Sequence, residues 1–207
     1  MIEIKNLKKS FEDKKLFDDF NLKIESGEFL VITGKSGSGK STLLNLIGAL
    51  EKPDSGEIIV DGYNLTSRYN KRKYYKEKIG FLFQNFALVE NRTVRQNLSL
   101  IQKSGRTDIS IEDALERVGL LKDIDTKVYK LSGGEQQRIA LARLMIKKCD
   151  IILADEPTGS LDSENSDVVM RILHELNKMG KTVVVVTHNS DIVKSAEKSF
   201  VIGYDNC

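Results

Sequence analysis

The chain contains a glycine-rich run whose residue types suit the binding of phosphate groups. The run GKSGSGKST extends from Gly34 to Thr42 and fits the spacing G-x-x-x-x-G-K-[ST]. Glycines let backbone N–H groups curve around phosphate oxygens, and the N-terminus of a following helix adds free N–H donors. We expect Lys40 to reach the β- and γ-phosphates of a nucleotide and Ser41 to coordinate Mg²⁺. The residues expected to contact the nucleotide are Gly34, Lys35, Ser36, Gly37, Ser38, Gly39, Lys40, Ser41 and Thr42.

Two adjacent carboxylates supply the second half of a site for phosphoryl transfer. They are Asp155 and Glu156 in IILADEP, which follow four apolar residues. The carboxyl end of a buried strand in an open α/β sheet faces the crevice where ligands bind. Asp155 therefore suits the metal, directly or through water, and Glu156 is placed to polarise an attacking water. The alternatives are an ordinary acidic strand end here and a chance glycine-rich turn at Gly34, and the pairing of the two motifs disfavours both.

The elements that position these residues show two hydrophobic patterns. Residues near the N-terminus alternate between apolar and polar, as in Ile2 to Lys5, Phe20 to Ile24 and the short run GEIIVDG, which predicts an antiparallel sheet with one solvent-exposed face. The runs EFLVIT, DIILAD and TVVVVT are instead apolar on both faces. This pattern is typical of central strands in a parallel sheet that helices cover.

Helical patterns lie between the apolar strands. An apolar helix follows the phosphate loop, with Leu43, Leu44, Leu46, Ile47 and Leu50. Another stripe ends at Gly180, a C-terminal cap, and consists of Val168, Val169, Ile172, Leu173, Leu176 and Met179. From about Gln84 to Lys148 no strand pattern is convincing, so we expect a helical lobe at about 86–148. The sequence predicts one α/β domain over residues 1–207.

Composition excludes some classes of protein. The 207 residues carry a formal net charge of +2, whereas dedicated nucleic-acid binders usually have a strong basic excess. The basic, tyrosine-containing stretch from Arg68 to Lys78 could be a nucleic-acid patch, but a solvent-exposed helix or loop face is favoured. Cys149 and Cys207 lack metal-ligand spacing, and a partly buried free thiol at Cys149 fits a reducing compartment. We expect neither a signal peptide nor a spanning helix.

Four further motifs follow the phosphate loop in a characteristic order. LSGGEQQR, ILADEP, GSLD and VTH together resemble the ATP-binding subunits of ABC transporters, over essentially the whole chain. Ser132, Gly133 and Gly134 look like the signature motif of that family, and the resemblance implies that they hold the γ-phosphate of ATP bound to the other subunit. A helix start with free N–H groups suits an anion. By itself the stretch would be read as a simple helix cap.

The resemblance implies roles for four more residues. Gln84 matches a glutamine that touches Mg²⁺ and the attacking water and links to the membrane partner. Asp162 matches a loop that crosses the dimer interface, and His188 matches a histidine that contacts the γ-phosphate. Phe11 stands where an aromatic side chain, often tyrosine, stacks on adenine. Mild departures are Glu135, where glutamine is commonest, and Asn189, where aspartate is common.

The resemblance also implies a fold and a function. The fold is the ABC ATPase fold: a phosphate-loop NTPase core with a mixed sheet, an antiparallel β subdomain and a helical lobe. The chain is expected to hydrolyse ATP with Mg²⁺, to pair as a homodimer when ATP binds, and to drive a separate permease from the cytoplasmic face of the membrane. FLFQNFALVENRTVRQNL and ADEPTGSLD are similar to the macrolide-exporter and lipoprotein-releasing branch. KIGFLFQNFALVENRTV together with KVYKLSGGEQQR is similar to ATPases of lactococcin-type bacteriocin export.

Other functions stay open at this point. A regulator of cell division that signals through a membrane partner without moving a solute has a similar length. An ABC ATPase that acts on chromosomes would need a long coiled-coil insertion, and one that acts on ribosomes usually carries two cassettes. The segment Gln84 to Asn97 carries apolar residues with few charges, and we expect Phe86, Leu88 and Val94 to form a partner surface. The alternative places these three side chains in the core.

Overall fold

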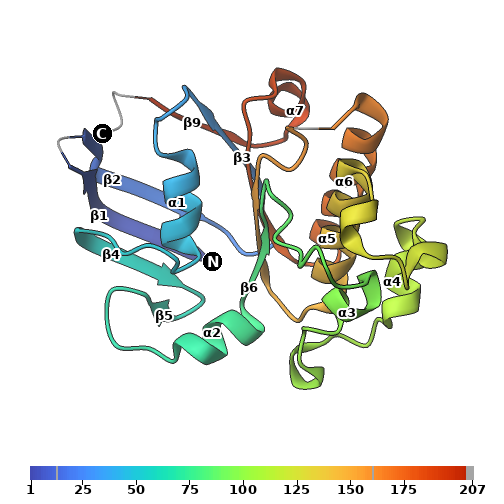
Figure 1. Cartoon of the computed structure of the whole chain (residues 1–207). Coiled ribbons are helices and arrows are strands. Elements are labelled where there is room, and N and C mark those ends of the chain that lie inside the picture. Colours follow the sequence, from blue (N-terminus) through green and yellow to red (C-terminus); the bar gives the residue numbers. More distant parts are fainter. Residues whose placement is uncertain (13, 160, 204–207) are drawn as a thin grey trace.

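Two sheets organise the chain in the computed structural model, which describes residues 1–12, 14–159 and 161–203. The first sheet is antiparallel, with the strand order β2-β1-β4-β5. Its strands are β1 (Ile2–Phe11), β2 (Lys14–Ile24), β4 (Ser55–Val60) and β5 (Tyr63–Asn64). In Figure 1 this sheet stands apart from the second sheet, with α1 between the two.

The second sheet is parallel at every described pairing and has the order β6-β7-β8-β3-β9. Its strands are β3 (Phe29–Gly34), β6 (Ile79–Leu82), β7 (Ile151–Asp155), β8 (Thr182–Val186) and β9 (Ser199–Ile202). The predicted α/β fold with an antiparallel subdomain is confirmed. The three runs that are apolar on both faces are the adjacent central strands β7, β8 and β3.

Each central strand contributes alternate residues to two hydrophobic cores. In β7, Ile151 and Leu153 pack with the antiparallel sheet and α1, whereas Ile152 and Ala154 pack with helices on the opposite face. The same alternation holds in β8 and β3, because side chains of a strand point in turn to its two sides. A strand covered on both faces has no position where a polar residue would be solvated, which explains the continuous apolar runs.

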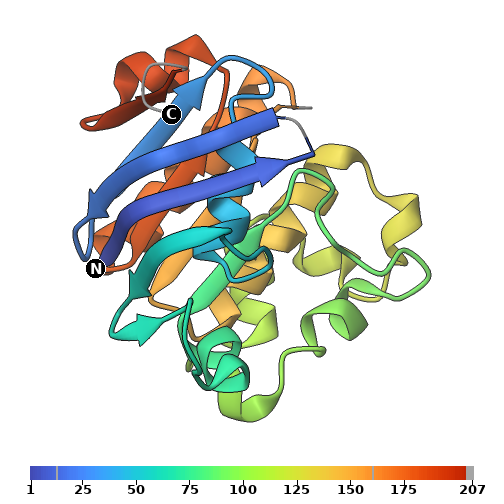
Figure 2. The same cartoon turned by 90° about the vertical axis from the view of Figure 1, so that its left-hand side faces the viewer.

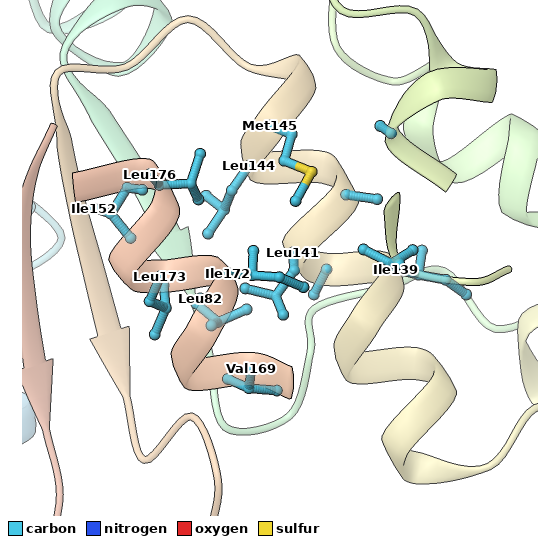
Figure 3. Packing of buried hydrophobic residues seen from close by; sticks show 14 of the residues in the cluster. Leu82, Ile139, Leu141, Leu144, Met145, Ile152, Val169, Ile172, Leu173 and Leu176 are labelled. Atoms are coloured by element: carbon cyan, nitrogen blue, oxygen red, sulfur yellow. The ribbon is translucent and has the colours of Figure 1, made fainter. Parts of the chain in front are cut away.

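Helices fill the two layers on either side of the parallel sheet. On one side α1 (Lys40–Ile47) lies beneath the antiparallel sheet, and Figure 2 shows β1 and β2 crossing in front of it. On the other side α5 (Gly133–Ile146) and α6 (Ser163–Lys178) pack against the sheet. Figure 3 shows Leu141 of α5 beside Ile172 of α6, and Leu144 of α5 beside Leu176 of α6.

The remaining helices are short. They are α2 (Lys71–Glu77), α3 (Val94–Leu98), α4 (Ile111–Arg117) and α7 (Ser190–Ser195), with 3₁₀ turns η1 (Lys103–Gly105), η2 (Leu121–Asp123) and η3 (Val128–Lys130). Residues 86–148 contain no strand beyond isolated bridges. The limits of a separate helical lobe stay a prediction, because α5 packs against both α4 and the parallel sheet.

Three local expectations need correction or refinement. Met179 is 60% exposed because α6 ends at Lys178, and Leu50 is 49% exposed because α1 ends before it at Ile47. Cys149 is a free cysteine that is buried rather than partly buried, and Cys207 lies outside the described residues. No helix in the described part of the chain is long and apolar enough to cross a membrane.

The tyrosines of the basic stretch have a structural role. Tyr74 is fully buried and its hydroxyl donates to the Ile47 carbonyl at 2.6 Å, while the Tyr75 hydroxyl donates to the Ala49 carbonyl at 2.6 Å. These bonds tie α2 to the end of α1. The cations Lys71, Arg72 and Lys73 are exposed on the same helix. The expected solvent-exposed face is therefore found only on the side that carries the cations, because the tyrosine rings face inward.

Candidate nucleotide site

The glycine-rich loop joins β3 to α1 and has a backbone that tolerates no side chain at several points. A Cβ atom on Gly34 would lie 2.3 Å from the Ile202 carbonyl oxygen. Gly39 has φ +95°, and a Cβ there would lie 2.9 Å from the Phe17 ring. Gly37, with φ +75°, also occupies the left-handed region. The loop is therefore shaped by close contacts with β2 and β9, and the Ser38 N–H closes a turn within it by donating to the Lys35 carbonyl at 3.2 Å.

The cation and hydroxyl of this loop are placed to meet an anion. Lys40 is 9% exposed, and its Nζ donates to the carbonyls of Gly34 at 2.9 Å and Lys35 at 3.0 Å. Its ammonium has no carboxylate within ion-pair distance among the described residues. The buried Ser38 hydroxyl oxygen has no hydrogen-bond partner in that part of the chain. A desolvated cation and an orphaned hydroxyl fit phosphate oxygens.

A pair of oxygens at the loop's end fits a magnesium ion. The Ser41 hydroxyl donates to Asp155 Oδ1 at 3.0 Å, so β7 and α1 meet at this point. Burial raises the pKa of Asp155 above its ordinary value. The hydrogen bond from Ser41 acts to lower this pKa, and the nearby charge of Glu156 acts to raise it. No group of three or more His, Cys, Asp or Glu residues forms a metal cluster among the described residues. Mg²⁺ in phosphate-transfer sites needs only one or two protein oxygens, because phosphates and waters complete its shell.

Glu156 lies next to Asp155, and three contacts hold its side chain. Its Oε1 lies 2.9 Å from His188 Nδ1, and its Oε2 accepts from the Thr187 hydroxyl at 3.2 Å and from the His188 N–H at 3.4 Å. Glu156 has φ +46°, an uncommon conformation for a non-glycine residue. The side chain of Glu156 is 14% exposed and that of His188 is 73% exposed. A cavity of about 790 Å³ between α6 and α7 begins at this pair.

Gln84 lies at the same edge of the sheet without a described bond to the carboxylates. It is exposed and follows β6 by two residues. Leu82 at the end of β6 pairs with Ala154, which precedes Asp155. The parallel register therefore brings Gln84 to the carboxyl edge where Asp155 and Glu156 stand.

Phe11 comes close to the phosphate loop through the β1–β2 hairpin. It pairs in register with Lys14, and Lys14 Nζ donates to the Gly37 carbonyl at 2.8 Å. The Phe11 ring is 46% exposed, with Lys9 Nζ 4.6 Å from its centroid. A ring that is free on one side beside the loop is suited to stacking on a base.

The serine-glycine stretch begins α5, away from this loop. Ser132 is the N-cap of α5 and accepts from the Glu135 N–H at 3.3 Å, while Glu135 Oε2 accepts from the Ser132 N–H at 2.8 Å and its hydroxyl at 2.9 Å. These bonds lower the pKa of the Glu135 carboxyl. A Cβ on Gly134 would lie 3.0 Å from the Asn165 side chain. Within the described chain, no hydrogen bond or ion pair joins Ser132 to the phosphate loop.

Asp162 caps the helix that lies beside this start. Its Oδ1 accepts from the Asn165 N–H at 2.8 Å at the beginning of α6, and this bond lowers the pKa of the Asp162 carboxyl. Arg138 of α5 donates to the same Asn165 side chain. The first turns of α5 and α6 are therefore joined through Asn165. Asp162 belongs with the α5 start rather than with the phosphate loop.

Sequence reasoning missed some supporting residues and misjudged one surface. Thr187 stands in the quoted VTH motif and was not singled out, and Lys14 carries no motif at all. Val94 is fully buried, so the expectation that it is exposed is wrong. Phe86 and Leu88 are partly buried against the same core. The core alternative is therefore confirmed for Val94, while the partner surface at Phe86 and Leu88 stays a prediction.

Comparison with known proteins places the chain in a family. The description "ABC transporter" belongs to the family profile that matches residues 17–159. The chain is 39% identical over 98% of its length to the ABC transporter ATP-binding protein YvrO of Bacillus subtilis, of which it covers 93%. It is 40% identical to the macrolide export ATP-binding/permease protein MacB of Campylobacter jejuni over 96% of the chain, but spans only 32% of that protein.

The solved structures agree with these relatives. The chain matches a dimeric post-hydrolysis state of the ATP-binding cassette MJ0796 bound to ADP and Pi with a TM-score of 0.84 and 36% identity, covering 97% of this chain and 94% of that one. It is also 41% identical over 94% of its length to the methionine import ATP-binding protein MetN of Legionella pneumophila, of which it covers 59%. The chain belongs to the ABC transporter family, as a nucleotide-binding ATPase that uses ATP and Mg²⁺.

Proposed function

We propose that the chain is the nucleotide-binding subunit of an exporter and drives a separate membrane permease. The observation that carries the catalytic part is the convergence of Lys40, Ser41, Asp155 and Glu156 at one edge of the parallel sheet. Lys40 and the loop N–H groups neutralise the β- and γ-phosphates. Ser41 and Asp155, with Gln84 beside them, hold Mg²⁺, which offsets phosphate charge when bound.

Glu156 acts on water in this proposal. Its Oε1 accepts a proton from the water that attacks the γ-phosphate, while Thr187 and His188 fix the orientation of the carboxylate. His188, whose ring is largely exposed, also contacts the γ-phosphate. Phe11 stacks on the adenine ring, and Gly34, Lys35, Ser36, Gly37, Ser38, Gly39 and Thr42 complete the contacts of the loop with nucleotide.

The second anion-binding element belongs to another copy of the chain. Ser132, Gly133 and Gly134 offer a hydroxyl and N–H groups at the start of a long helix, yet this start makes no described bond to the phosphate loop of its own chain. A head-to-tail homodimer that closes on ATP places each start on the partner's γ-phosphate. The matched cassette MJ0796 is described as dimeric, which supports this arrangement.

The proposed direction of transport and class of substrate rest on similarity to relatives in the family. The relatives include macrolide exporters near 40% identity and a methionine importer at 41%, so identity alone favours neither direction. Two sequence segments favour export of a peptide, bacteriocin or drug, as in the macrolide and lactococcin-type systems. They are FLFQNFALVENRTVRQNL and KVYKLSGGEQQR. The chain then works at the cytoplasmic face of the membrane, bound through its permease.

A transport assay tests this proposal. The chain is co-purified from membranes of its own cells with the permease it retains, and the complex is reconstituted in liposomes. ATP supplied on the side of the nucleotide-binding subunit should drive labelled peptide or macrolide away from that side. The Glu156→Gln variant is the control and should move no substrate. Movement toward the ATP side would instead make the system an importer, and an ATPase that retains a permease but moves neither substrate would favour a signalling role.

A further inference from the structure

A lysine at the start of β2 contacts the phosphate loop although it belongs to no motif. Lys14 Nζ donates to the Gly37 carbonyl at 2.8 Å. Gly37 leaves room for this ammonium, because a Cβ atom there would lie 3.1 Å from Lys14 Nζ. Within the described chain Lys14 has no carboxylate at ion-pair distance, whereas its neighbour Lys15 pairs with Asp18 at 2.9 Å. The Lys14 ammonium therefore meets a neutral carbonyl, and no described carboxylate compensates its charge.

Lys14 lies between the two ends of the expected nucleotide. It pairs in register with Phe11, whose ring is 46% exposed and is suited to stacking on a base. The same lysine reaches Gly37, in the loop to whose carbonyls Lys40 donates. A nucleotide whose base stacks on Phe11 and whose β- and γ-phosphates meet Lys40 therefore has its phosphate chain beside the Lys14 ammonium.

The charge of the loaded site favours a further cation. ATP carries about four negative charges at neutral pH, and Mg²⁺ together with Lys40 offsets about three of them. The carboxyl groups of Asp155 and Glu156 at the adjacent strand end add negative charge. An ammonium gains more from a phosphate oxygen than from a carbonyl, because attraction between opposite charges then adds to the hydrogen bond. The exchange of the Gly37 carbonyl for phosphate is therefore favourable for Lys14.

We propose that Lys14 is a nucleotide-binding residue, whose ammonium leaves the Gly37 carbonyl and donates to an oxygen of the phosphate chain when ATP binds. The inference rests on the proposed function, since it assumes that the nucleotide lies between Phe11 and Lys40. Lys40 acts from a buried position within the loop, and Lys14 acts from the exposed hairpin. The β1–β2 hairpin then holds both parts of the nucleotide, the base through Phe11 and the phosphates through Lys14.

Calorimetric titration of the nucleotide-free chain with ATP tests the proposal. EDTA is present, so that no Mg²⁺ supports hydrolysis during the titration. Lys14→Met keeps the aliphatic stem and removes the charge. We expect its dissociation constant for ATP to rise about tenfold at low ionic strength, the scale of one charge-assisted hydrogen bond. Added salt should shrink this difference, because counter-ions screen an exposed charge.

A second variant separates a phosphate contact from a brace that only shapes the loop. The side chain of Lys14→Gln has no charge, but its amide N–H groups can still donate to the Gly37 carbonyl. We expect this variant to bind ATP as weakly as Lys14→Met does. Wild-type affinity in Lys14→Gln, or a loss in both variants that salt does not change, would assign Lys14 to the shape of the loop and overturn the proposal. Wild-type affinity in both variants would overturn it as well.

Lys15→Met is the matched control for net charge. Lys15 is an exposed cation of the same strand, and its Nζ donates to Asp18 rather than to the loop. This variant should bind ATP as the wild type does. A loss equal to that of Lys14→Met would mean that the overall charge of the hairpin attracts ATP, and the proposed contact would be wrong.

Lys40→Ala tests the site itself in the same titration. It should weaken ATP binding whether or not Lys14 contacts phosphate. A loss in Lys40→Ala with none in Lys14→Met contradicts the role of Lys14 alone. Wild-type affinity in Lys40→Ala would instead show that ATP does not lie in the loop, which overturns the proposed nucleotide site together with the role of Lys14.

Discussion

At the scale of single residues, Glu156 combines an uncommon backbone conformation with a fixed side chain. Its φ of +46° is maintained while His188 and Thr187 hold its two oxygens. Backbone strain at a positioned carboxylate is common where geometry serves chemistry. The Glu156→Gln variant keeps the shape and removes the base, so ATP should still bind while steady-state hydrolysis falls by about a hundredfold or more.

The measurement is phosphate release alongside titration with a fluorescent ATP analogue. Glu116→Gln is a suitable control, because Glu116 is an exposed acid of α4, away from His188 and Thr187 in the sequence. It should hydrolyse ATP at the wild-type rate. Near-normal turnover by Glu156→Gln would remove Glu156 from the role of base.

Asp155, which we propose holds Mg²⁺, makes the nucleotide-free fold less stable. Burial raises the pKa of Asp155 in the folded chain above its value in the unfolded chain. The folded protein therefore loses stability as the pH rises from the lower of these two pKa values through the higher one. At neutral pH the ionised group therefore destabilises the nucleotide-free fold. Asp155→Asn should raise the melting temperature without ligand and abolish the further gain that Mg²⁺ and ATP give the wild type.

Thermal denaturation with and without Mg²⁺ and ATP checks this prediction. Asp150→Asn is the matched control, because Asp150 precedes the same strand, lies away from Ser41 and is exposed. It should keep the full Mg²⁺-dependent gain. A lower melting temperature of nucleotide-free Asp155→Asn would show that the carboxylate stabilises the site.

The residues that could be predicted from sequence are those whose chemistry depends on local spacing. Lys40, Ser41, Asp155 and Glu156 each stand at the end of a strand or the start of a helix that the pattern itself marks. The contacts that sequence could not reveal join distant segments. Lys14 reaches the Gly37 carbonyl only because the β1–β2 hairpin folds over the loop. Glu135 and Ser132 form a capping box that their spacing in the sequence predicts. The spacing does not show whether this helix start also contacts a ligand.

At the scale of elements, the basic helix α2 stabilises the end of α1 through a buried tyrosine. The Tyr74 hydroxyl satisfies the carbonyl of Ile47, which is a C-terminal carbonyl of α1. Tyr74→Phe keeps the ring and removes this bond, so it leaves a buried acceptor unpaired. We expect the free energy of unfolding to fall by about 1–3 kcal/mol.

Urea unfolding followed by circular dichroism measures that loss. Tyr129→Phe is the control, since Tyr129 is 52% exposed and its hydroxyl has no described hydrogen bond. That variant should unfold at the wild-type midpoint. An unchanged midpoint for Tyr74→Phe would mean that water replaces the hydroxyl at the Ile47 carbonyl.

Elements were predictable wherever one pattern extended over the whole element. The strands apolar on both faces became β3, β7 and β8 because two cores meet at the parallel sheet. Errors occurred at the ends of elements, where a residue's periodic position no longer decides its burial. Met179 and Leu50 are exposed because each helix stops before them, and Val94 is buried because α3 packs beneath α5.

At the scale of the whole molecule, the chain carries two separate elements that we propose bind anions. One is the phosphate loop with Lys40, and the other is the start of α5 at Ser132, which is joined to α6 through Asn165. If a second copy supplies the α5 start, each active site is shared between two chains. Ser132→Arg should then leave ATP binding to the monomer nearly normal, because Lys40 and Phe11 are unchanged. It should abolish ATP-driven dimer closure, because the bulky side chain fills the second phosphate site.

Mixing Ser132→Arg with Lys40→Ala makes the test sharper. Lys40→Ala alone should bind ATP weakly and hydrolyse none, since it loses the cation of the phosphate loop. In a mixed dimer one site carries both changes and the other carries neither, so the mixture should recover ATP-dependent association that each variant lacks alone. Light scattering and crosslinking of each variant and of the mixture, with and without ATP, provide the measurement. If Ser132→Arg dimerises with ATP as the wild type does, the serine-glycine stretch is only a helix cap and the site belongs to one chain.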